Sequence, residues 1–263
     1  MVDDGVTPWR RSDAEPIDVS FGRIDRTGAL NLAASIVDVA RDLSRSVPWP
    51  RGAPYFHLDT GVPYDLGVFD ALSGRGIFRK YEFALEIGSG MGGRARWLAA
   101  RTGCRILGVD PCAAVVAAAA TLNRRARMDD QVNFLVARPD RLPLRERVFT
   151  HVWLLSGDGD AENSAGLREA FRVLRRGGHF AVQAPILDAA SRTQLTHVLQ
   201  SVGFDEIEVC EAVLSEIPHA CRIARERLCG ALRSQPELLT RWREADRWPA
   251  ERGCLQIFAR RPA

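Results

Sequence analysis

A glycine-rich stretch and a distant aspartate are the first residues of this 263-residue chain whose types and spacing could do chemistry. Gly88, Gly90 and Gly93 form a Gly-x-Gly-x-x-Gly pattern within "ALEIGSGMGG", between an apolar run and a helical one. Such a turn lets a ligand approach the backbone closely, and the next helix offers free N–H groups to an anion. Asp110 follows Gly90 by twenty residues and can accept both hydroxyls of a ribose. The pattern fits NAD and any other adenosine ligand.

Two neighbouring residues narrow the choice of ligand. Glu86 and Gly92 extend the pattern to Glu-x-Gly-x-Gly-x-Gly. A carboxylate at position 86 would repel a pyrophosphate and suits a ligand that carries an amino group. No Lys-Ser or Lys-Thr pair follows the glycines, which argues against a triphosphate cradle. We therefore predict an adenosine ligand with an amino-acid tail, with a dinucleotide as the alternative.

Alternating strands and helices must position these residues. After Tyr81 the predicted strands read "EFALEIG", "CRILGVD", "QVNFLVA", "VFTHVWLL", "HFAVQAP", "FDEIEVCEA" and "CLQIFARR". Apolar runs separated by helices are typical of a parallel sheet covered on both faces. We predict a helix over residues 162–176 that Gly177 and Gly178 end, and another from Ala29 to Leu43. About forty residues of helical character precede the last strand.

Five motifs in order carry a family resemblance: "LEIGSGMGG", "GVDP", "RLPL", "LREAFRVLRRGGHFAV" and "SVGFDEIEV". They resemble class I S-adenosylmethionine-dependent methyltransferases, notably the small-molecule branch with quinone, sterol and sugar methyltransferases. The resemblance implies an α/β, Rossmann-like, doubly wound seven-stranded sheet in the order 3-2-1-4-5-7-6 with the last strand antiparallel. We expect an N-terminal arm and helical cap over 1–79, and the methyltransferase domain over 80–263 with a helical lid insertion at about 213–250.

The resemblance also implies S-adenosyl-L-methionine as the cofactor and assigns its contacts. The loop residues Gly88, Ser89, Gly90 and Gly92 would pass under the methionine portion, with Glu86 near its amino group and Asp110 at the ribose. The residues that would flank the adenine, or border the cofactor where the substrate enters, are Pro111, Cys112, Arg138, Pro139, Asp140, Leu155 and Ser156.

Two positions depart from the family pattern. Arg138 stands where the family usually has an aspartate that contacts the adenine amino group, and a guanidinium cannot accept that hydrogen bond. Asp140 could replace the aspartate only if its loop shifts. The fourth strand opens with Phe149-Thr150 where the family usually has Phe-Asp. We therefore expect reduced affinity for the cofactor or a different way of holding it.

Histidine is the side chain best suited to deprotonate a methyl acceptor at neutral pH. His57 and His219 are candidates because, by the resemblance, their segments lie on the cofactor side. His151 is a weaker candidate, since a histidine inside a strand is more often packed in the core. His179 and His197 are expected to be structural. Methyl transfer depends mainly on alignment of the two reactants, so a dedicated base is optional.

Composition excludes several classes of partner. The net charge of +3 is small and the basic residues are scattered, which argues against binding of nucleic acid, and the longest apolar run is too short to span a membrane.

Six cysteines without a Cys-x-x-Cys pair predict free thiols. No metal site is expected, because the acidic run from Asp158 lacks the glycine of a calcium loop. The first residues do not resemble a signal peptide, so we expect a cytoplasmic protein, and one lysine among 36 basic residues fits a bacterial genome rich in G and C.

The function predicted from these observations is methyl transfer from S-adenosyl-L-methionine to a small acceptor, such as a quinone-like molecule, a lipid or a secondary metabolite. Three alternatives remain open. A NAD(P)-dependent oxidoreductase would share Gly88, Gly90, Gly93 and Asp110 but not the later motifs. A catalytically degenerate relative could keep the fold as a binding or scaffold protein, and another enzyme could use the same cofactor for a different transfer.

Overall fold

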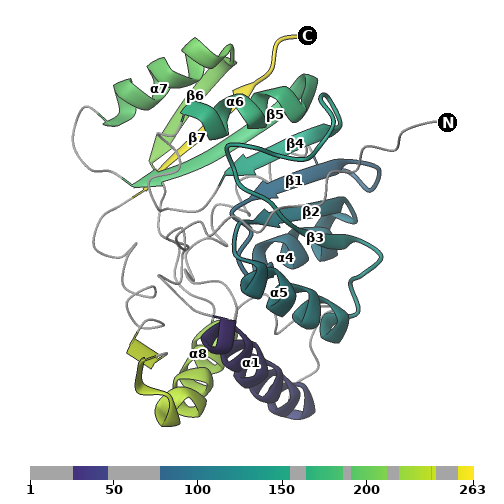
Figure 1. The fold of residues 1–263 in the computed structure, drawn as a ribbon, viewed down its shortest axis with the longest axis vertical. Coiled ribbons are helices and arrows are strands. Elements are labelled where there is room, and N and C mark those ends of the chain that lie inside the picture. Colours follow the sequence, from purple (N-terminus) through teal and green to yellow (C-terminus); the bar gives the residue numbers. More distant parts are fainter. Residues whose placement is uncertain are drawn as a thin grey trace, which may run out of the picture.

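The computed structural model describes residues 26–46, 78–154, 164–185, 191–211, 219–237, 239–240 and 254–263. The strands in these ranges are β1 (Phe83–Ile87), β2 (Arg105–Asp110), β3 (Val132–Val136), β4 (Phe149–Leu154), β5 (Leu174–Pro185), β6 (Asp205–Glu211) and β7 (Cys254–Arg260). The helices are α1 (Arg26–Ser46), α4 (Gly93–Thr102), α5 (Ala113–Ala126), α6 (Ser164–Val173), α7 (Ser191–Val202), α8 (His219–Ala231) and the short 3-10 helix η2 (Leu232–Ser234). Figure 1 shows their arrangement.

The seven strands form one sheet in the order β3-β2-β1-β4-β5-β7-β6. The pairs β3-β2, β2-β1, β1-β4 and β4-β5 are parallel, whereas β7 runs antiparallel between β5 and β6. This order and the antiparallel last strand confirm the predicted fold class. The last strand, "CLQIFARR", is inserted between β5 and β6, so the chain returns from the edge strand β6 before it forms β7.

Helices cover both faces of the sheet because successive strand residues point in opposite directions. On one face, Leu85 packs in a buried cluster with Leu167 of α6 and Leu195 of α7. On the other face, Ala84 packs with Leu98 of α4. In Figure 1, α6 and α7 lie near β5 and β6, and α4 and α5 lie near β1 to β3. The sheet is therefore the middle layer of three, as in other doubly wound proteins.

Helices α1 and α8 lie side by side beyond the sheet and pack with α5 (Figure 1). Leu32 and Ile36 of α1, Val115 of α5 and Leu228 of α8 share one buried apolar cluster. The predicted N-terminal helix is confirmed and extends further at both ends than Ala29–Leu43. The predicted arm before residue 26 and much of the insertion at 213–250 fall outside the described residues, and α8 with η2 is the helical part of that insertion that the structure describes.

The predicted helix stop at Gly177 and Gly178 is wrong. Helix α6 ends before Leu174, where β5 begins, and Leu174 pairs with Phe149 across a register shift between β4 and β5. Leu174 is fully buried, so its apolar side chain favours the sheet over another turn of helix. The glycines shape the start of the strand instead, because Gly177 has φ +66° and a Cβ on Gly178 would stand 2.8 Å from the Arg175 carbonyl oxygen.

The described part of the chain contains no helix long and apolar enough to cross a membrane. Nor do its His, Cys, Asp and Glu residues form a group of three that could hold a metal ion. The described cysteine side chains are free thiols, as predicted: Cys104, Cys112, Cys210 and Cys229. Burial raises the pKa of the Cys104 thiol to about 11, so this cysteine is an unreactive core residue at neutral pH.

Candidate functional site

The carboxyl ends of β1, β2, β3 and β4 meet at one edge of the sheet because these strands run parallel. From β1 the chain moves to β2 and β3 on one side, whereas β4 lies on the other side of β1. Ligands of open α/β sheets bind outside the carboxyl ends of the strands at such a reversal of strand order. Gly88 follows β1 directly and Asp110 ends β2, so the structure brings these two predicted site residues together there.

The glycine loop (residues 88–93) is held by backbone hydrogen bonds to β2. The N–H groups of Gly88 and Ser89 both donate to the Val109 carbonyl, at 2.9 and 3.0 Å. Gly88 and Gly90 have φ values of +71° and +53°, which residues with a side chain rarely adopt. The side-chain oxygen of Ser89 is buried and has no hydrogen-bond partner among the described residues. The backbone of the loop is therefore held in one conformation, and the Ser89 hydroxyl is a buried polar group that a ligand could bind.

Asp110 ties the glycine loop to the start of α5. One carboxylate oxygen accepts the Gly90 N–H at 3.1 Å, and the other accepts the Cys112 N–H at 2.9 Å. The side chain is fully buried. Each oxygen of a carboxylate has two lone pairs, so these two bonds still allow it to accept hydroxyl groups. Asp110 thus has a structural role that the sequence did not reveal, and the ribose contact stays a prediction.

Glu86 is bound by an arginine of the protein itself. Arg94 donates from Nε to Glu86 Oε1 at 2.7 Å and from Nη2 to the Gly88 carbonyl at 2.9 Å. The Glu86 and Arg94 side chains are only 0% and 8% exposed. Arg94 was not predicted as a site residue. A cation in the first turn of a helix is unfavourable next to the positive end of the helix dipole, so its presence there was an indication that it has an acidic partner. Because this pair balances the charge of Glu86, the acid by itself does not indicate an amino group on a ligand.

Gly92 likewise has an internal explanation. It precedes α4 with φ +83°, and a Cβ on it would stand 2.1 Å from Phe134 Cζ. A Cβ on Gly108 would stand 2.7 Å from Phe134 Cδ1. The ring of Phe134, on β3, therefore fills a slot that exists only because two glycines line it. Packing explains Gly92, and its predicted contact with the cofactor stays a prediction.

The post-β3 segment (residues 137–144) contains the predicted adenine contacts. Arg138 donates from Nε and Nη2 to both oxygens of Asp140, at 2.9 and 3.0 Å. This ion pair lowers the pKa of Asp140 below its usual value. Pro139 is buried against α6, where a Cβ on Gly166 would stand 3.6 Å from Pro139 Cβ. Arg138 and Asp140 therefore contact each other, and the predicted contacts of both with adenine remain predictions.

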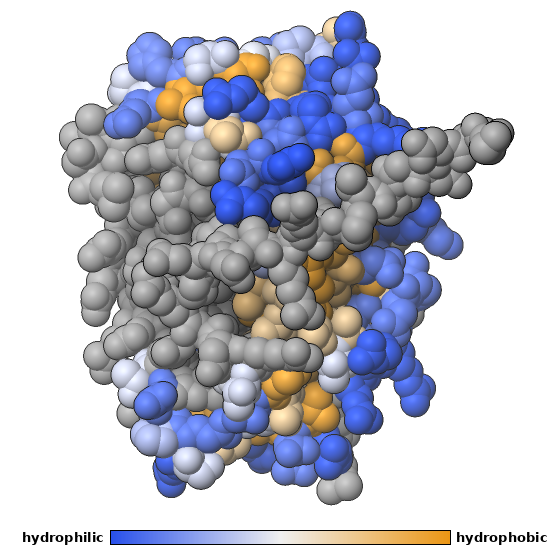
Figure 2. Space-filling model, in the orientation of Figure 1, coloured by the Kyte–Doolittle hydropathy of each residue, from blue (hydrophilic) through white to orange (hydrophobic). Residues whose placement is uncertain are grey.

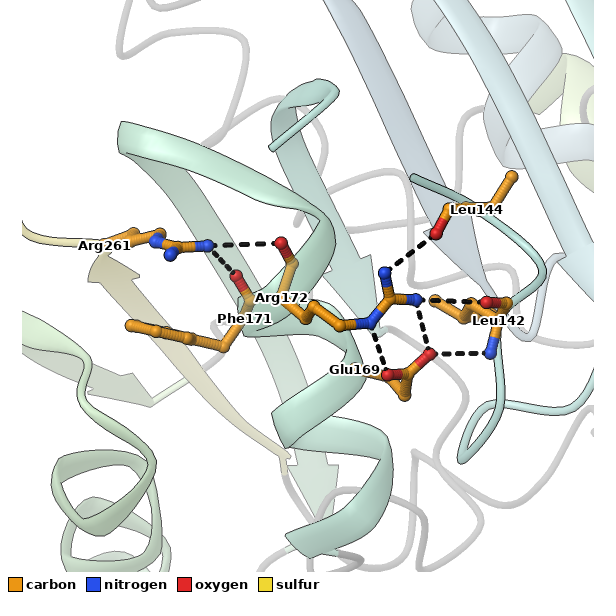
Figure 3. Close-up of polar contacts among 6 residues, drawn as sticks. All are labelled: Leu142, Leu144, Glu169, Phe171, Arg172 and Arg261. Atoms are coloured by element: carbon orange, nitrogen blue, oxygen red, sulfur yellow. Dashed lines mark hydrogen bonds and ion pairs between the residues drawn. The ribbon is translucent and has the colours of Figure 1, made fainter. Parts of the chain in front are cut away.

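Two residues of α6 hold the same segment and were missed in the sequence (Figure 3). Glu169 accepts the Leu142 N–H at 2.8 Å, while Arg172 donates to the Leu142 carbonyl at 3.0 Å and to the Leu144 carbonyl at 2.8 Å. Glu169 and Arg172 also pair with each other at 2.6 and 2.8 Å. Their spacing of three residues on a helix was the available signal, but it is equally common on exposed helices. We call Gly166, Glu169 and Arg172 the α6 clamp.

His151 is the candidate histidine whose side chain the structure describes, and it does not lie at the carboxyl edge of the sheet. His151 pairs in register with Ala84, four residues before Gly88, so about 13 Å of strand separates it from the glycine loop. It is buried, stacks on Phe78 with ring centroids 4.3 Å apart, and shares a hydrogen bond of 2.9 Å with Thr150. This environment favours packing over catalysis. His57, Leu155, Ser156 and the side chain of His219 lie outside the described residues.

Thr150, which stands where the family usually has an aspartate, has a structural role in the sheet. Thr150 Oγ1 accepts the Phe83 N–H at 3.1 Å and lies 3.1 Å from the Phe83 carbonyl oxygen. It therefore joins the amino ends of β4 and β1, at the opposite end of the strands from the glycine loop. Pro111, which follows Asp110, is half-buried at the edge where the resemblance places the adenine.

A cavity of about 400 Å³ lies on the face of the sheet over β4, β5, β7 and β6. Its lining includes His151, His179, Trp153, Glu206 and Arg260. Among the predicted site residues that the structure describes, His151 alone lines it. The position of the glycine loop at the reversal of strand order is a stronger indication of a functional site than the size of this cavity, because ligands of open α/β sheets bind at such a reversal.

An apolar layer lies next to the glycine loop. Met91, within the loop, is fully buried in the cluster that α1, α5 and α8 form. Figure 2, in the orientation of Figure 1, shows apolar surface in the middle of the visible face and again at its lower end, where Figure 1 places α1 and α8. The N-terminal helix α1, the insertion helix α8 and Met91 of the glycine loop thus belong to one apolar cluster.

Residues 85–182 match the family described as a methyltransferase domain. Among curated relatives, the sterol 24-C-methyltransferase of Saccharomyces cerevisiae is 29% identical over 102 residues, which cover 38% of this chain and 27% of that one. The sarcosine/dimethylglycine N-methyltransferase of Halorhodospira halochloris is 29% identical over 167 residues, covering 55% of this chain and 59% of that one. The chain thus matches less than two thirds of the length of each.

Solved structures share the fold at low sequence identity. The [4+2]-cyclase SpnF superposes with a TM-score of 0.58 and 19% identity, covering 74% of this chain and 81% of that chain. Phosphoethanolamine N-methyltransferase 2 of Haemonchus contortus, solved with S-adenosyl-L-methionine, gives a TM-score of 0.56 and 19% identity, covering 76% and 53%. Neither the family match nor these relatives support the nicotinamide-dependent alternative.

Proposed function

We propose that this protein transfers a methyl group from S-adenosyl-L-methionine to a small organic acceptor, because residues 85–182 match a methyltransferase domain and the sheet has the strand order that the class I resemblance implies. The observation that carries this proposal is the joint position of the glycine loop and Asp110. They meet where the strand order reverses, and Gly90 donates its N–H to the Asp110 carboxylate at 3.1 Å.

The residues at this edge fit the cofactor. Gly88 and Gly90 leave the backbone open to close approach, and the buried Ser89 oxygen lacks a partner among the described residues, so it suits a polar group of the methionine portion. Asp110 is fixed by two backbone N–H groups and can accept ribose hydroxyls with its remaining lone pairs. Pro111 and Cys112, with the post-β3 segment opposite, would flank the base.

The bound cofactor would supply an activated methyl group on its sulfonium. The task left to the protein is to hold the acceptor atom in line with that methyl group, and such positioning can contribute about 7–11 kcal/mol to lowering a barrier. The hydrogen bonds that hold the glycine loop serve this task, since a loop that is already ordered needs less ordering when the cofactor binds. A general base is not required for an acceptor that is already nucleophilic.

The apolar layer beside the loop supports a proposal for the class of acceptor. Met91 is buried among apolar residues of α1, α5 and α8, so these helices are suited to line a site for an apolar molecule. The names of the relatives include a sterol and a dimethylglycine methyltransferase, which are both small-molecule enzymes. We therefore propose a quinone-like, lipid or secondary-metabolite acceptor.

Titration calorimetry with S-adenosylhomocysteine, S-adenosylmethionine and NADH tests the proposal. We expect one binding site for each of the first two ligands and none for NADH. Asp110→Ala should weaken binding roughly a hundredfold or more, because charged hydrogen bonds at the loop and the ribose are both lost. The control Asp205→Ala changes an exposed aspartate of β6 and should bind normally. Unchanged affinity in Asp110→Ala would remove the ribose assignment, and saturable binding of NADH alone would overturn the proposal.

A binding protein without methyl transfer is the second candidate, and Arg138 is the observation that favours it. Arg138 is engaged with Asp140, and its guanidinium cannot accept the hydrogen bond from the adenine amino group that the family's usual aspartate accepts. The fold itself also hosts a protein named as a cyclase. Incubation with methyl-labelled cofactor and a panel of phenols, sterols and amines, together with calorimetry, distinguishes the candidates: no label transfer to any acceptor and no heat with S-adenosylmethionine or S-adenosylhomocysteine favour the second.

A further inference from the structure

The post-β3 segment is anchored at both ends to parts of the candidate site. At its start, the Ala137 N–H donates to the backbone carbonyl of Asp110 at 3.1 Å. Toward its end, both backbone groups of Leu142 are bound by side chains of the α6 clamp. Pro139, between these anchors, is buried against Gly166. The shape of the segment is therefore set by α6, a helix more than twenty residues further along the chain.

The α6 clamp acts as one unit. Gly166, Glu169 and Arg172 follow one another at intervals of three residues, so they lie on the same face of α6. The hydrogen bonds from Arg172 lower the pKa of Glu169, which keeps its carboxylate charged at neutral pH. Arg172 needs the planar fork of a guanidinium, because it binds two carbonyls and a carboxylate at once (Figure 3).

We propose that Glu169 and Arg172 are positioning residues that fix the post-β3 segment against the base end of the cofactor; this inference rests on the proposed function. The physical reason is preorganisation. A segment released from α6 would have to be ordered when the cofactor binds, and ordering each backbone residue opposes binding. The clamp removes that cost in advance, so its loss weakens binding without changing the methyl end, which the glycine loop holds.

Calorimetric titration with S-adenosylhomocysteine separates positioning from simple loss of structure. A positioning residue changes the dissociation constant, whereas partial unfolding lowers the number of sites per chain. We expect Glu169→Ala to raise the dissociation constant roughly tenfold, the effect of losing one charged hydrogen-bond network, with about one site retained. Arg172→Lys keeps the charge but not the fork, and we expect a rise of roughly threefold to tenfold.

Arg261, which follows β7, provides a matched control because it contacts the end of α6. Its guanidinium donates to the carbonyls of Phe171, Arg172 and Leu174 at 2.6, 3.2 and 2.8 Å and stacks 4.4 Å from the Phe171 ring centroid, but among the described residues it makes no hydrogen bond to the post-β3 segment. Figure 3 shows the bonds to Phe171 and Arg172. Arg261→Gln should lower the stability of the protein and leave the dissociation constant within twofold. Glu206→Gln, in the exposed ion pair with Arg260, should change neither.

The outcomes distinguish failure of the proposed function from failure of the positioning role. If the wild-type protein binds no S-adenosylhomocysteine, the proposed function fails. If it binds, and Glu169→Ala and Arg172→Lys both keep the wild-type dissociation constant, the positioning role fails. It also fails if Arg261→Gln weakens binding as much as Glu169→Ala does, because general loosening of α6 would then explain both. Should Glu169→Ala not fold, Glu169→Gln keeps an acceptor for the Leu142 N–H, and we expect a rise of roughly threefold.

Discussion

The glycine loop and the post-β3 segment border the same candidate site, yet they are held by different means. The loop is buried, and its contacts come from its immediate neighbours in sequence and from β2: Glu86, Arg94 and Asp110. The segment is partly exposed, and its contacts come from side chains of α6. The loop is thus held by the strands and the helix that directly border it, whereas the segment depends on the side chains of a helix that packs against it from outside the site.

Removal of Arg94 should have the largest effect and tests whether the loop depends on its buried ion pair. Arg94→Ala leaves the fully buried Glu86 carboxylate without this partner, and breaking one side of a buried pair costs about 3–5 kcal/mol of unfolding free energy. Urea denaturation followed by circular dichroism measures the loss. The double variant Glu86→Gln/Arg94→Ala should recover part of it, because no buried charge remains. A loss below 1 kcal/mol in Arg94→Ala would show that the loop does not rely on the pair.

A side chain at Gly92 should have the next largest effect. Gly92→Ala places a Cβ 2.1 Å from Phe134 Cζ at φ +83°, so overpacking and backbone strain together should cost about 2–4 kcal/mol. Gly103→Ala is the matched control: its φ is +75°, but its nearest neighbour, Lys80 Cγ, would be 3.5 Å away, so only strain of about 1–2 kcal/mol remains. Equal losses in the two variants would contradict the packing explanation, as would failure of Phe134→Leu to rescue Gly92→Ala.

The post-β3 segment should be less costly to disturb and should respond to pH through Glu169. Because the pKa of Glu169 is lowered in the folded state, its ion pair contributes stability above the unfolded pKa of about 4.3 and loses it as pH falls through the folded value. Glu169→Gln should therefore lower the unfolding free energy by about 1–2 kcal/mol at pH 7. The difference from the wild type should shrink in urea titrations between about pH 5 and pH 3. A difference that does not change with pH would contradict a charged role for Glu169.

The same contrast explains what the sequence could predict. The sheet order followed from motifs in the right succession, and the glycine loop was found because its spacing is local. The reasons given for Glu86 and Gly92 were incomplete, since their partners Arg94 and Phe134 become neighbours only through the turn of α4 and the pairing of β3. The α6 clamp was missed because a glutamate and an arginine three residues apart do not reveal which backbone groups they will bind.

The prediction at Gly177 and Gly178 failed for a related reason. Glycine pairs usually end helices, but here the burial of Leu174 against β4 decides where β5 begins. Tertiary packing overrides a local signal in this case, as it does at Glu86. Local patterns in this chain therefore predict the order of strands, helices and loops, whereas the ends of elements and the partners of charged side chains depend on the assembled sheet.

The smallest effect is expected at the tip of the post-β3 segment, where Arg138 pairs with Asp140. Their side chains are 48% and 31% exposed, so solvent and salt screen the pair, and Arg138→Gln should change the unfolding free energy by only about 0–1 kcal/mol. Urea titrations at 0.05 and 0.5 M NaCl measure it, and any loss should vanish at the higher salt. A loss comparable to that of Glu169→Gln, persisting at high salt, would show that the tip is held as firmly as the clamped part. The whole post-β3 segment, including its tip, would then be firmly held, and not only the part that α6 contacts.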